Sequence, residues 1–313
     1  MKYSVVGNPP VKVSKIALGG HEYLPEGGLR GFGEEFELAI KPGVNFEGFG
    51  GDRRRNVVET ALGQGVNFFD VTIDEEKDAL GRNLSELGAH EEVFVQTRPA
   101  NMCYGYDEYN TKMIQYDTLR EEVKRSASLL QRDRIYFLNF GIEYESLEYH
   151  DNFLGALEEN VKRLKHEELI SYACFDCLSR PVTNRESAYL QAIETGAFDA
   201  INVNINFADQ WALNRIIPAA ERANIAVFAR EVFMKGRLFP MLAAADIPAG
   251  EGVAAAIRWI HAIDGITSSI VGAASSDECR VNASIGRDPL MTEDAEETIN
   301  QVQTTEAFAR YTN

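Results

Sequence analysis

Short apolar runs alternate along the chain with segments in which apolar residues recur every three or four positions. The short runs predict buried strands, and the recurring positions predict amphipathic helices. The predicted strands cover residues 15–18, 66–70, 93–96, 135–140, 170–175, 200–205, 226–229 and 268–271. Helical spacing is clear in four of the segments between them, marked by Val57, Val58, Ala61 and Leu62; by Ala79, Leu80, Leu84 and Leu87; by Leu119, Val123, Ala127 and Leu130; and by Leu154, Leu157, Val161 and Leu164.

This alternation predicts the fold class. Strands separated by helices or long connections, with no polar linker between them, favour a closed (β/α)8 TIM barrel over two domains. The main rival is a doubly wound open sheet, in which a glycine-rich fingerprint would follow the first strand of a dinucleotide-binding unit. The glycines here, Gly19 and Gly20, are followed by His21 and do not form that fingerprint. We therefore expect one barrel domain spanning residues 1–313.

Composition narrows the range of partners. The formal net charge is -17, whereas binding of nucleic acid or an anionic membrane relies on clustered lysine and arginine. No apolar run approaches the roughly 20 residues that cross a bilayer, and the first residues lack the pattern of a signal peptide. We expect a soluble, cytoplasmic protein that binds neither nucleic acid nor membrane.

The cysteines do not predict a disulfide scaffold. Four are present, at positions 103, 174, 177 and 279, without the dense spacing of small secreted domains. Cys174 and Cys177 form a C-x-x-C, which can indicate redox chemistry or half of a zinc site. No second pair completes a zinc site, and Cys174 lies inside a predicted buried strand. Coincidental spacing is the favoured interpretation.

Residues 66–84, VNFFDVTIDEEKDALGRNL, place Asp70 at the end of a buried strand and a helix after it. This stretch resembles the active-site segment of the aldo-keto reductases, in which N-F-F-D-T-A is followed by Tyr-Gly and then S-E-x-x-L-G. Residues 2–20 resemble that family's N-terminal hairpin, residues 133–140 its fourth strand, and residues 270–282 its phosphate and adenosine segment. The resemblance, in the family's order over almost the whole chain, implies a TIM barrel with an N-terminal β-hairpin.

The resemblance also implies a changed active site. The family uses Asp, Tyr, Lys and His: the tyrosine protonates the carbonyl oxygen during hydride transfer, and the other three tune its pKa or orient the substrate. Asp70 matches the aspartate. The tyrosine position falls on Glu75 or on Ile73, depending on whether it is counted from Asp70 or from the Leu-Gly pair. The lysine corresponds to Arg98, and the histidine falls on or near Gly141.

The cofactor implied by the resemblance is NAD(P)H, and its expected contacts are also altered. Asn202 takes the place of a glutamine on the sixth strand, and Asp176 lies where the family has a Ser-Asn pair. A carboxylate at Glu278 would repel the 2'-phosphate of NADPH, although it could accept hydrogen bonds from a free ribose hydroxyl of NADH. The candidate cofactor-binding residues are Asn202, Gly272, Ala273, Glu278 and Asn282.

The strand ends of a barrel carry its chemistry, and here they are rich in polar residues. The candidate catalytic residues are Asp70, Glu75, Arg98 and His21, and the candidate substrate-binding residues are Tyr23, Asp176, Asn206, Arg230 and Glu231. Neighbouring carboxylates beside an arginine or histidine can have their pKa values pushed apart, which supplies an acid and a base. No close spacing of metal ligands occurs among them, so no metal site is predicted.

The loop at residues 22–51 is longer than the family normally has at this point. It contains many glycines and five aromatic residues, Tyr23, Phe32, Phe36, Phe46 and Phe49. Burial against the barrel is one interpretation, and a lid that closes over a small polar ligand is the other.

Three hypotheses about function remain open. The first is a diverged aldo-keto reductase-like enzyme that performs acid-base chemistry, as a lyase, isomerase or epimerase, on a small hydroxy-carbonyl or sugar-like substrate. The second is an NAD(P)H-dependent oxidoreductase of aldehydes, ketones or sugars, in which Glu75, His21 or Tyr23 replaces the missing tyrosine. The third is a non-catalytic relative that binds a metabolite. We favour the first, because it accounts for both the lost proton donor and the new charged groups.

Overall fold

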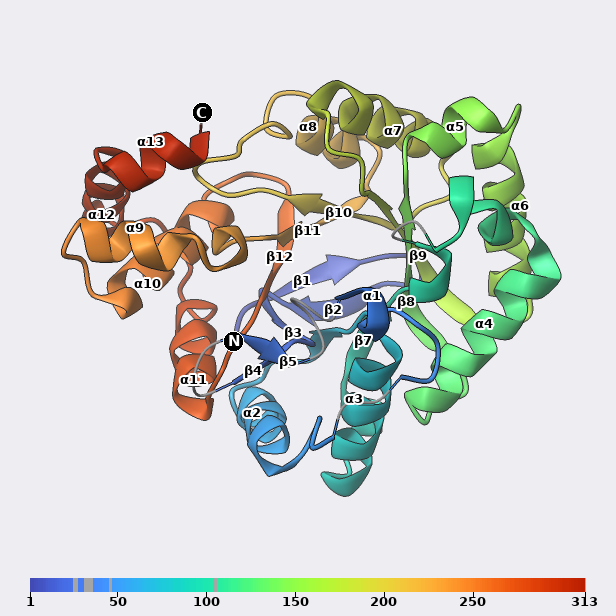
Figure 1. Ribbon diagram of the computed structural model, residues 1–313, viewed down its shortest axis with the longest axis horizontal. Coiled ribbons are helices and arrows are strands. Elements are labelled where there is room, and N and C mark those ends of the chain that lie inside the picture. The colour runs from blue at the N-terminus through green and yellow to red at the C-terminus, as the bar shows by residue number, and fades with distance from the viewer. Residues whose placement is uncertain (25–27, 31–35, 45–46, 104–105, 313) are drawn as a thin grey trace.

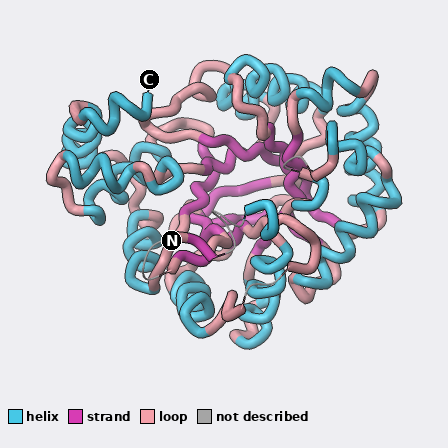
Figure 2. Tube along the Cα trace, viewed as in Figure 1, coloured by secondary structure: helices cyan, strands magenta, loops and turns pink. Residues whose placement is uncertain are grey.

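The computed structural model describes residues 1–313 except 25–27, 31–35, 45–46, 104–105 and 313. Eight parallel strands form a closed barrel, each pairing with the next along the chain and the last with the first. Helices surround the strands (Figures 1 and 2). The barrel strands are β3 (Ile16–Gly19), β6 (Phe68–Asp70), β7 (Phe94–Thr97), β8 (Ile135–Ile142), β9 (Ile170–Cys177), β10 (Ala200–Asn204), β11 (Ala226–Arg230) and β12 (Ile266–Val271).

The side chains of each barrel strand point alternately into the lumen and outward toward the helices, and they form two separate hydrophobic cores. Residues facing the lumen form a small aromatic cluster that includes Phe68, Phe137, Tyr172 and Phe228. Their neighbours along the strands face outward and join the large core beneath the helices. Because successive side chains of a strand point to opposite faces, the same alternation carries every second residue at the strand ends into the mouth of the barrel.

An N-terminal hairpin closes the floor of the barrel. Its strands, β1 (Tyr3–Val6) and β2 (Val11–Ser14), pair antiparallel and cross the centre of the ring in Figure 1. Val6 and Val13 enter the lumen cluster, and the Tyr172 hydroxyl donates to the carbonyl of Pro9 at 2.6 Å. Gly7, at φ 76°, lies so close to the Tyr172 ring that a Cβ would be 2.2 Å from it.

The helices pack their apolar stripes onto the outer face of the barrel. They are α1 (Phe36–Ala39), α2 (Asp52–Gly63), α3 (Asp74–Glu86), α4 (Tyr116–Leu129), α5 (Glu145–Tyr149), α6 (Phe153–His166), α7 (Val182–Thr195), α8 (Ile216–Arg222), α9 (Leu238–Ala244), α10 (Ala249–His261), α11 (Ser276–Ile285), α12 (Glu293–Gln303) and α13 (Glu306–Thr312). Short 3-10 turns cover His90–Glu92, Ala100–Met102, Glu108–Ile114 and Met234–Gly236. Helices α9, α10, α12 and α13 gather on one side of the barrel (Figure 1).

The predicted TIM barrel with an N-terminal β-hairpin is therefore confirmed. All eight predicted strands are present, with bounds that differ by at most a few residues. Within the described ranges, none of the helices combines the length and the apolar character needed to span a membrane.

Candidate active site at the mouth of the barrel

A layer of polar side chains closes the lumen just below the mouth. Gln96 on β7 donates to Asp70 on β6 at 2.7 Å and to the Asn202 amide oxygen, across the barrel on β10, at 3.0 Å. The Asn202 nitrogen donates back to Gln96 at 3.1 Å. Gln96 and Asn202 are both completely buried. Both polar atoms of the Asn202 amide are thus engaged inside the protein, which does not suit the expected contact with a nicotinamide.

Above this layer, two arginines share one aspartate. Asp176 at the end of β9 accepts from Arg98 at 2.8 Å and from Arg230 at 2.6 Å, both on Oδ2. Its Oδ1 lies 3.1 Å from the Tyr189 hydroxyl, which also contacts the carbonyl of Asn202. Arg98 and Asp176 are buried, whereas Arg230 is 22 % exposed at the mouth. The structure brings together these three predicted residues, which lie far apart in the sequence.

A histidine and a buried glutamate form the second cluster. His21 Nδ1 lies 2.7 Å from Glu76 Oε1, and the other Glu76 oxygen accepts from the Thr72 amide at 2.7 Å. The His21 side chain is 38 % exposed, whereas that of Glu76 is 1 % exposed. Burial alone would raise the pKa of Glu76, but His21, the Thr72 amide and Arg54 outweigh it and hold that pKa below its ordinary value.

The carboxylate that meets His21 at 2.7 Å is Glu76, which the sequence did not single out, and the predicted Glu75 is the residue before it. Both glutamates lie in the first turn of α3 and both are buried. Successive residues of a helix point about 100° apart, so only one of the two can face the mouth in this direction. A carboxylate on Nδ1 leaves Nε2 as the basic nitrogen of the neutral ring.

Tyr23 lies over the end of the last barrel strand. A Cβ on Gly272, directly after β12, would lie 2.6 Å from the Tyr23 hydroxyl oxygen. Burial raises the pKa of the Tyr23 phenol above its ordinary value, against the opposing effect of Arg54, so the phenol is protonated at neutral pH. Its place between β12 and the His21 cluster makes Tyr23 a candidate proton donor at the mouth.

The segment expected to hold the cofactor phosphates makes its contacts within the protein. The Asn282 amide nitrogen donates to the Gly272 carbonyl at 3.1 Å, and the following Ala273 is buried. At the start of α11, Glu278 Oε2 accepts from the Ala274 amide at 2.8 Å while its own amide donates to Ser275. Helix N-termini attract anions, but here the protein's own carboxylate occupies that place.

These contacts decide the fit of a nicotinamide dinucleotide bound in the expected manner. Asn202 is held by Gln96, and Tyr23 covers Gly272. At the start of α11 the Ala274 amide donates to the Glu278 carboxylate, and the Arg53 guanidinium donates to the Ala274 carbonyl. To hold that group in this manner, these side chains would have to release their present contacts.

Two further predicted residues shape the loops beside the mouth. Asn206 Oδ1 accepts from the Ala208 and Asp209 amides, and its nitrogen donates to the Glu231 carbonyl at 3.3 Å. Glu231 has φ 57°, a left-handed conformation uncommon for residues other than glycine, and its carboxylate pairs with Lys235 at 3.0 Å. Such conformations cluster at functional sites.

The described parts of loop 22–51 contact one another and also contact helix α3, where Arg82 donates to the Phe49 carbonyl at 3.2 Å. The loop forms a short hairpin of β4 (Glu22–Tyr23) and β5 (Leu29–Arg30), and Glu22 accepts from the Gly50 amide at 2.8 Å. The Gly43 amide donates to Asp74 at 2.9 Å, within a buried cluster that also contains Lys77 and Arg125. Phe49 is buried. Phe32, Phe46 and the Phe36 side chain lie outside the described residues.

The C-x-x-C does not form a paired thiol site. Cys174 belongs to the lumen core and Cys177 to the outer core, so the two thiols face opposite sides of β9. Among the described residues, no group of three or more His, Cys, Asp and Glu side chains is arranged to hold a metal ion.

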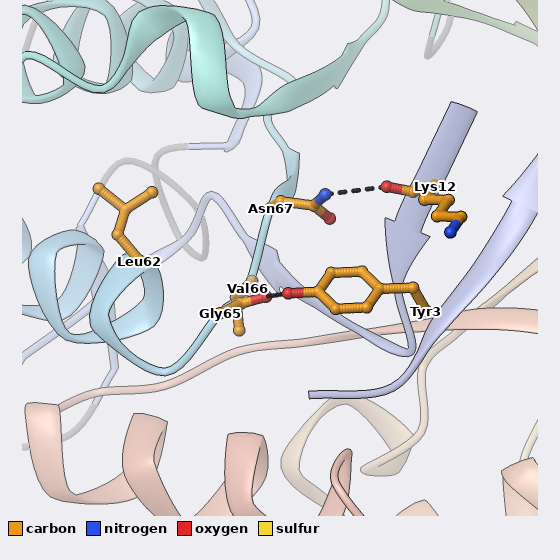
Figure 3. Close-up of a pocket in the computed structure, with 6 residues that line it drawn as sticks. All are labelled: Tyr3, Lys12, Leu62, Gly65, Val66 and Asn67. Atoms are coloured by element: carbon orange, nitrogen blue, oxygen red, sulfur yellow. Dashed lines mark hydrogen bonds between the residues drawn. The ribbon is translucent and has the colours of Figure 1, made fainter.

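A cavity of about 320 Å³ lies at the other end of the barrel, beside the hairpin. In Figure 3 the Tyr3 hydroxyl donates to the Gly65 carbonyl at 2.9 Å and the Asn67 amide to the Lys12 carbonyl at 2.8 Å. These polar groups serve the packing of the hairpin. The chemistry-bearing residues gather at the mouth instead, which is therefore the candidate active site.

No protein-family model matches the chain, and no curated protein matches it. Among solved structures, a glycerol dehydrogenase from Gluconobacter oxydans is similar at a TM-score of 0.68 and 16% identity, over 96% of this chain and 94% of that one. An aldo-keto reductase from Bacillus halodurans, in its holo form, is similar at a TM-score of 0.67 and 17% identity, over 96% of each chain. The chain has the fold of the aldo-keto reductases.

Proposed function

We propose that the chain is a diverged enzyme of the aldo-keto reductase superfamily that catalyses proton transfer next to a carbonyl of a small hydroxy-carbonyl or sugar-like substrate. The observation that carries the proposal is the hydrogen bond between His21 and the buried Glu76. A histidine oriented through Nδ1 by a carboxylate is a general base at Nε2. A cytoplasmic location and the absence of nucleic-acid partners stay predictions from the acidic composition.

In the proposed reaction, Nε2 of His21 removes a proton from the carbon beside the substrate carbonyl. The C–H bond breaks, its electron pair moves into the enolate, and Glu76 stabilises the imidazolium that forms. Tyr23, protonated at neutral pH, supplies a proton to the enolate oxygen, and the guanidinium of Arg230 adds positive charge. When the carbonyl forms again, the Tyr23 phenolate takes a proton back from a hydroxyl of the enediol. Delivery of the proton held by His21 to the neighbouring carbon gives an isomer, and protonation of the original carbon on its opposite face gives an epimer. Loss of a β-hydroxyl as water, with its proton supplied by the His21 imidazolium, gives a lyase product.

A deuterium-exchange screen tests this function. The protein is incubated in D2O with a panel of hydroxy-ketones, hydroxy-aldehydes and sugars, without nucleotide, and NMR follows the hydrogens beside each carbonyl. We expect at least one compound to exchange or convert, and His21→Asn to lose that activity while Arg55→Met, a surface change on α2, retains it. No exchange with any compound, or equal exchange by His21→Asn, would overturn the proposal.

The second candidate, an NAD(P)H-dependent oxidoreductase, is favoured by the structural likeness to a glycerol dehydrogenase. Fluorescence titration of the protein with NADPH and with NADH separates it from the first. Saturable nucleotide binding in the micromolar range would favour hydride transfer. No binding up to millimolar nucleotide would contradict the oxidoreductase hypothesis, because hydride transfer needs a bound nucleotide. A protein that binds compounds from the panel but neither exchanges nor reduces them would support the third candidate, a metabolite-binding relative.

A further inference from the structure

Arg54 is a buried arginine that lies beneath the turn from which His21 projects. It comes from α2, and only 5 % of the residue is exposed. Its Nη2 donates to the carbonyl of Gly19 at 2.6 Å and its Nη1 to the carbonyl of His21 at 3.4 Å. These two carbonyls flank Gly20, so the guanidinium holds the main chain on both sides of that residue.

Glu76 meets the same turn from α3. A Cβ on Gly20 would lie 2.8 Å from Glu76 Oε2 and 3.0 Å from the carbonyl oxygen of Asp70. Gly20 therefore lets the Glu76 carboxylate approach the main chain closely. The turn that carries His21 is fixed by a buried cation on one helix and a buried anion on the next.

The charge of Arg54 is costly at this place. Removing an arginine from water is costly, and apolar residues of similar volume usually stabilise a buried position as well or better. Glu76 and Glu22 attract the guanidinium, but among the described residues no carboxylate oxygen forms a salt bridge with it within 4.0 Å. Its hydrogen bonds go instead to the two carbonyls that set the direction of the His21 side chain.

We infer that Arg54 is a positioning residue for the proposed reaction: it fixes the His21 main chain so that Nδ1 meets Glu76 and the ring keeps its Nδ1–H tautomer. The inference deepens the proposed function and rests on it. Arg54 acts through His21 and does not need to contact the substrate. Displacing a catalytic group by about 1 Å can cost about 100-fold in rate, so the effect is large enough to measure.

The test is ¹⁵N NMR of the whole protein labelled at histidine, in which the ring nitrogens report the tautomer of His21. The signal of His21 is assigned from its loss in His21→Asn. We expect the Nδ1–H tautomer in the wild type, loss of that tautomer in Arg54→Met, and partial recovery in Arg54→Lys. Arg55→Met is the matched control on the same helix and should leave the signal unchanged. Exchange activity should fall about 100-fold in Arg54→Met with a small change in KM.

The two proposals fail differently. An unchanged His21 tautomer in a folded Arg54→Met protein would overturn the positioning role, whatever the exchange assay shows. If Arg54→Met does not fold, Arg54→Lys decides: an Nδ1–H population equal to that of the wild type overturns the inference, and a reduced one supports it. If the proposed function is wrong, the wild type shows no deuterium exchange with any compound, although substitution of Arg54 still changes the His21 tautomer.

Discussion

Arg98 fills the space beside Gly141: a Cβ built on this glycine would lie 2.8 Å from Nη1 of Arg98. The resemblance to the aldo-keto reductases implies that the family's lysine corresponds to Arg98 and that its histidine falls on or near Gly141. The guanidinium of Arg98, directly after β7, therefore needs the absence of a side chain at Gly141 on β8. Because Asp176 holds Arg98 at 2.8 Å, the guanidinium is a fixed buried cation beside Gly141.

Gly141→Ala should destabilise the protein. Arg98 is buried and held by Asp176, so it cannot move aside as a surface side chain would, and overpacking of this kind costs about 1–3 kcal/mol. Arg98→Lys in the same chain should recover part of the loss, because the shorter head group leaves room for the methyl. Urea unfolding of the single and double variants measures this coupling.

Gly250→Ala is the control for that series, because a Cβ at Gly250 meets no atom within 4 Å and alanine favours the helix. It should be neutral or stabilising. A Gly141→Ala protein as stable as the wild type would contradict the close packing of Arg98 against β8.

Asp176→Asn should destabilise strongly. Two arginines converge on one carboxylate oxygen, and removing a buried partner leaves its cation uncompensated, at a cost of about 3–5 kcal/mol. Asp277→Asn, which breaks an exposed pair with Arg280, is the control and should show no measurable change. Equal stability of the two variants would refute the central role of Asp176.

The ionised Glu76 carboxylate should make the free energy of unfolding fall at acid pH. Its pKa in the folded protein lies below its ordinary value of 4.5. Its contribution to stability is therefore complete above pH 4.5 and is lost as pH falls through the folded pKa. The difference in unfolding free energy between wild type and Glu76→Gln should shrink over that range. A difference that is constant from pH 7 to pH 3 would argue against an ionised, stabilised Glu76.

The cysteines should be unreactive in the folded protein. Burial raises the pKa of Cys177 and of Cys279 to about 11 and that of Cys103 to about 12, and it also raises that of Cys174. Thiolates are the reactive form, so a thiol reagent at pH 8 should label none of the four until the chain is unfolded. Rapid labelling of native protein at Cys174 or Cys177 would revive a redox role for the C-x-x-C.

The barrel could be predicted from the sequence because buried parallel strands are continuous apolar runs between helices. The same alternation could have identified Gln96, which the prediction missed. It lies two residues before Arg98 on the same strand face, and a buried glutamine needs hydrogen-bond partners. The sequence predicts instead that its partner Asn202 contacts a cofactor. The pairing of Gln96 with Asn202 across the lumen could not be predicted, because it depends on closure of the barrel.

Two other residues could not be identified from local sequence. Glu75 and Glu76 are adjacent acids in the first turn of one helix, and the rotation of α3 alone decides which one reaches His21. Arg54 lies among three consecutive arginines that look like a solvated surface, yet it is buried whereas Arg53 and Arg55 are half-buried. Roles that depend on helix rotation or on long-range packing need the three-dimensional structure.

The most direct test of the central claim is the rate of deuterium incorporation beside the carbonyl of a substrate found in the screen, compared between wild type, His21→Asn and Glu76→Gln without nucleotide. Loss of a general base typically costs a factor of about 10²–10⁴, and we expect both variants to fall by about 100-fold or more. Exchange by either variant at the wild-type rate would show that the His21–Glu76 pair does not transfer the proton.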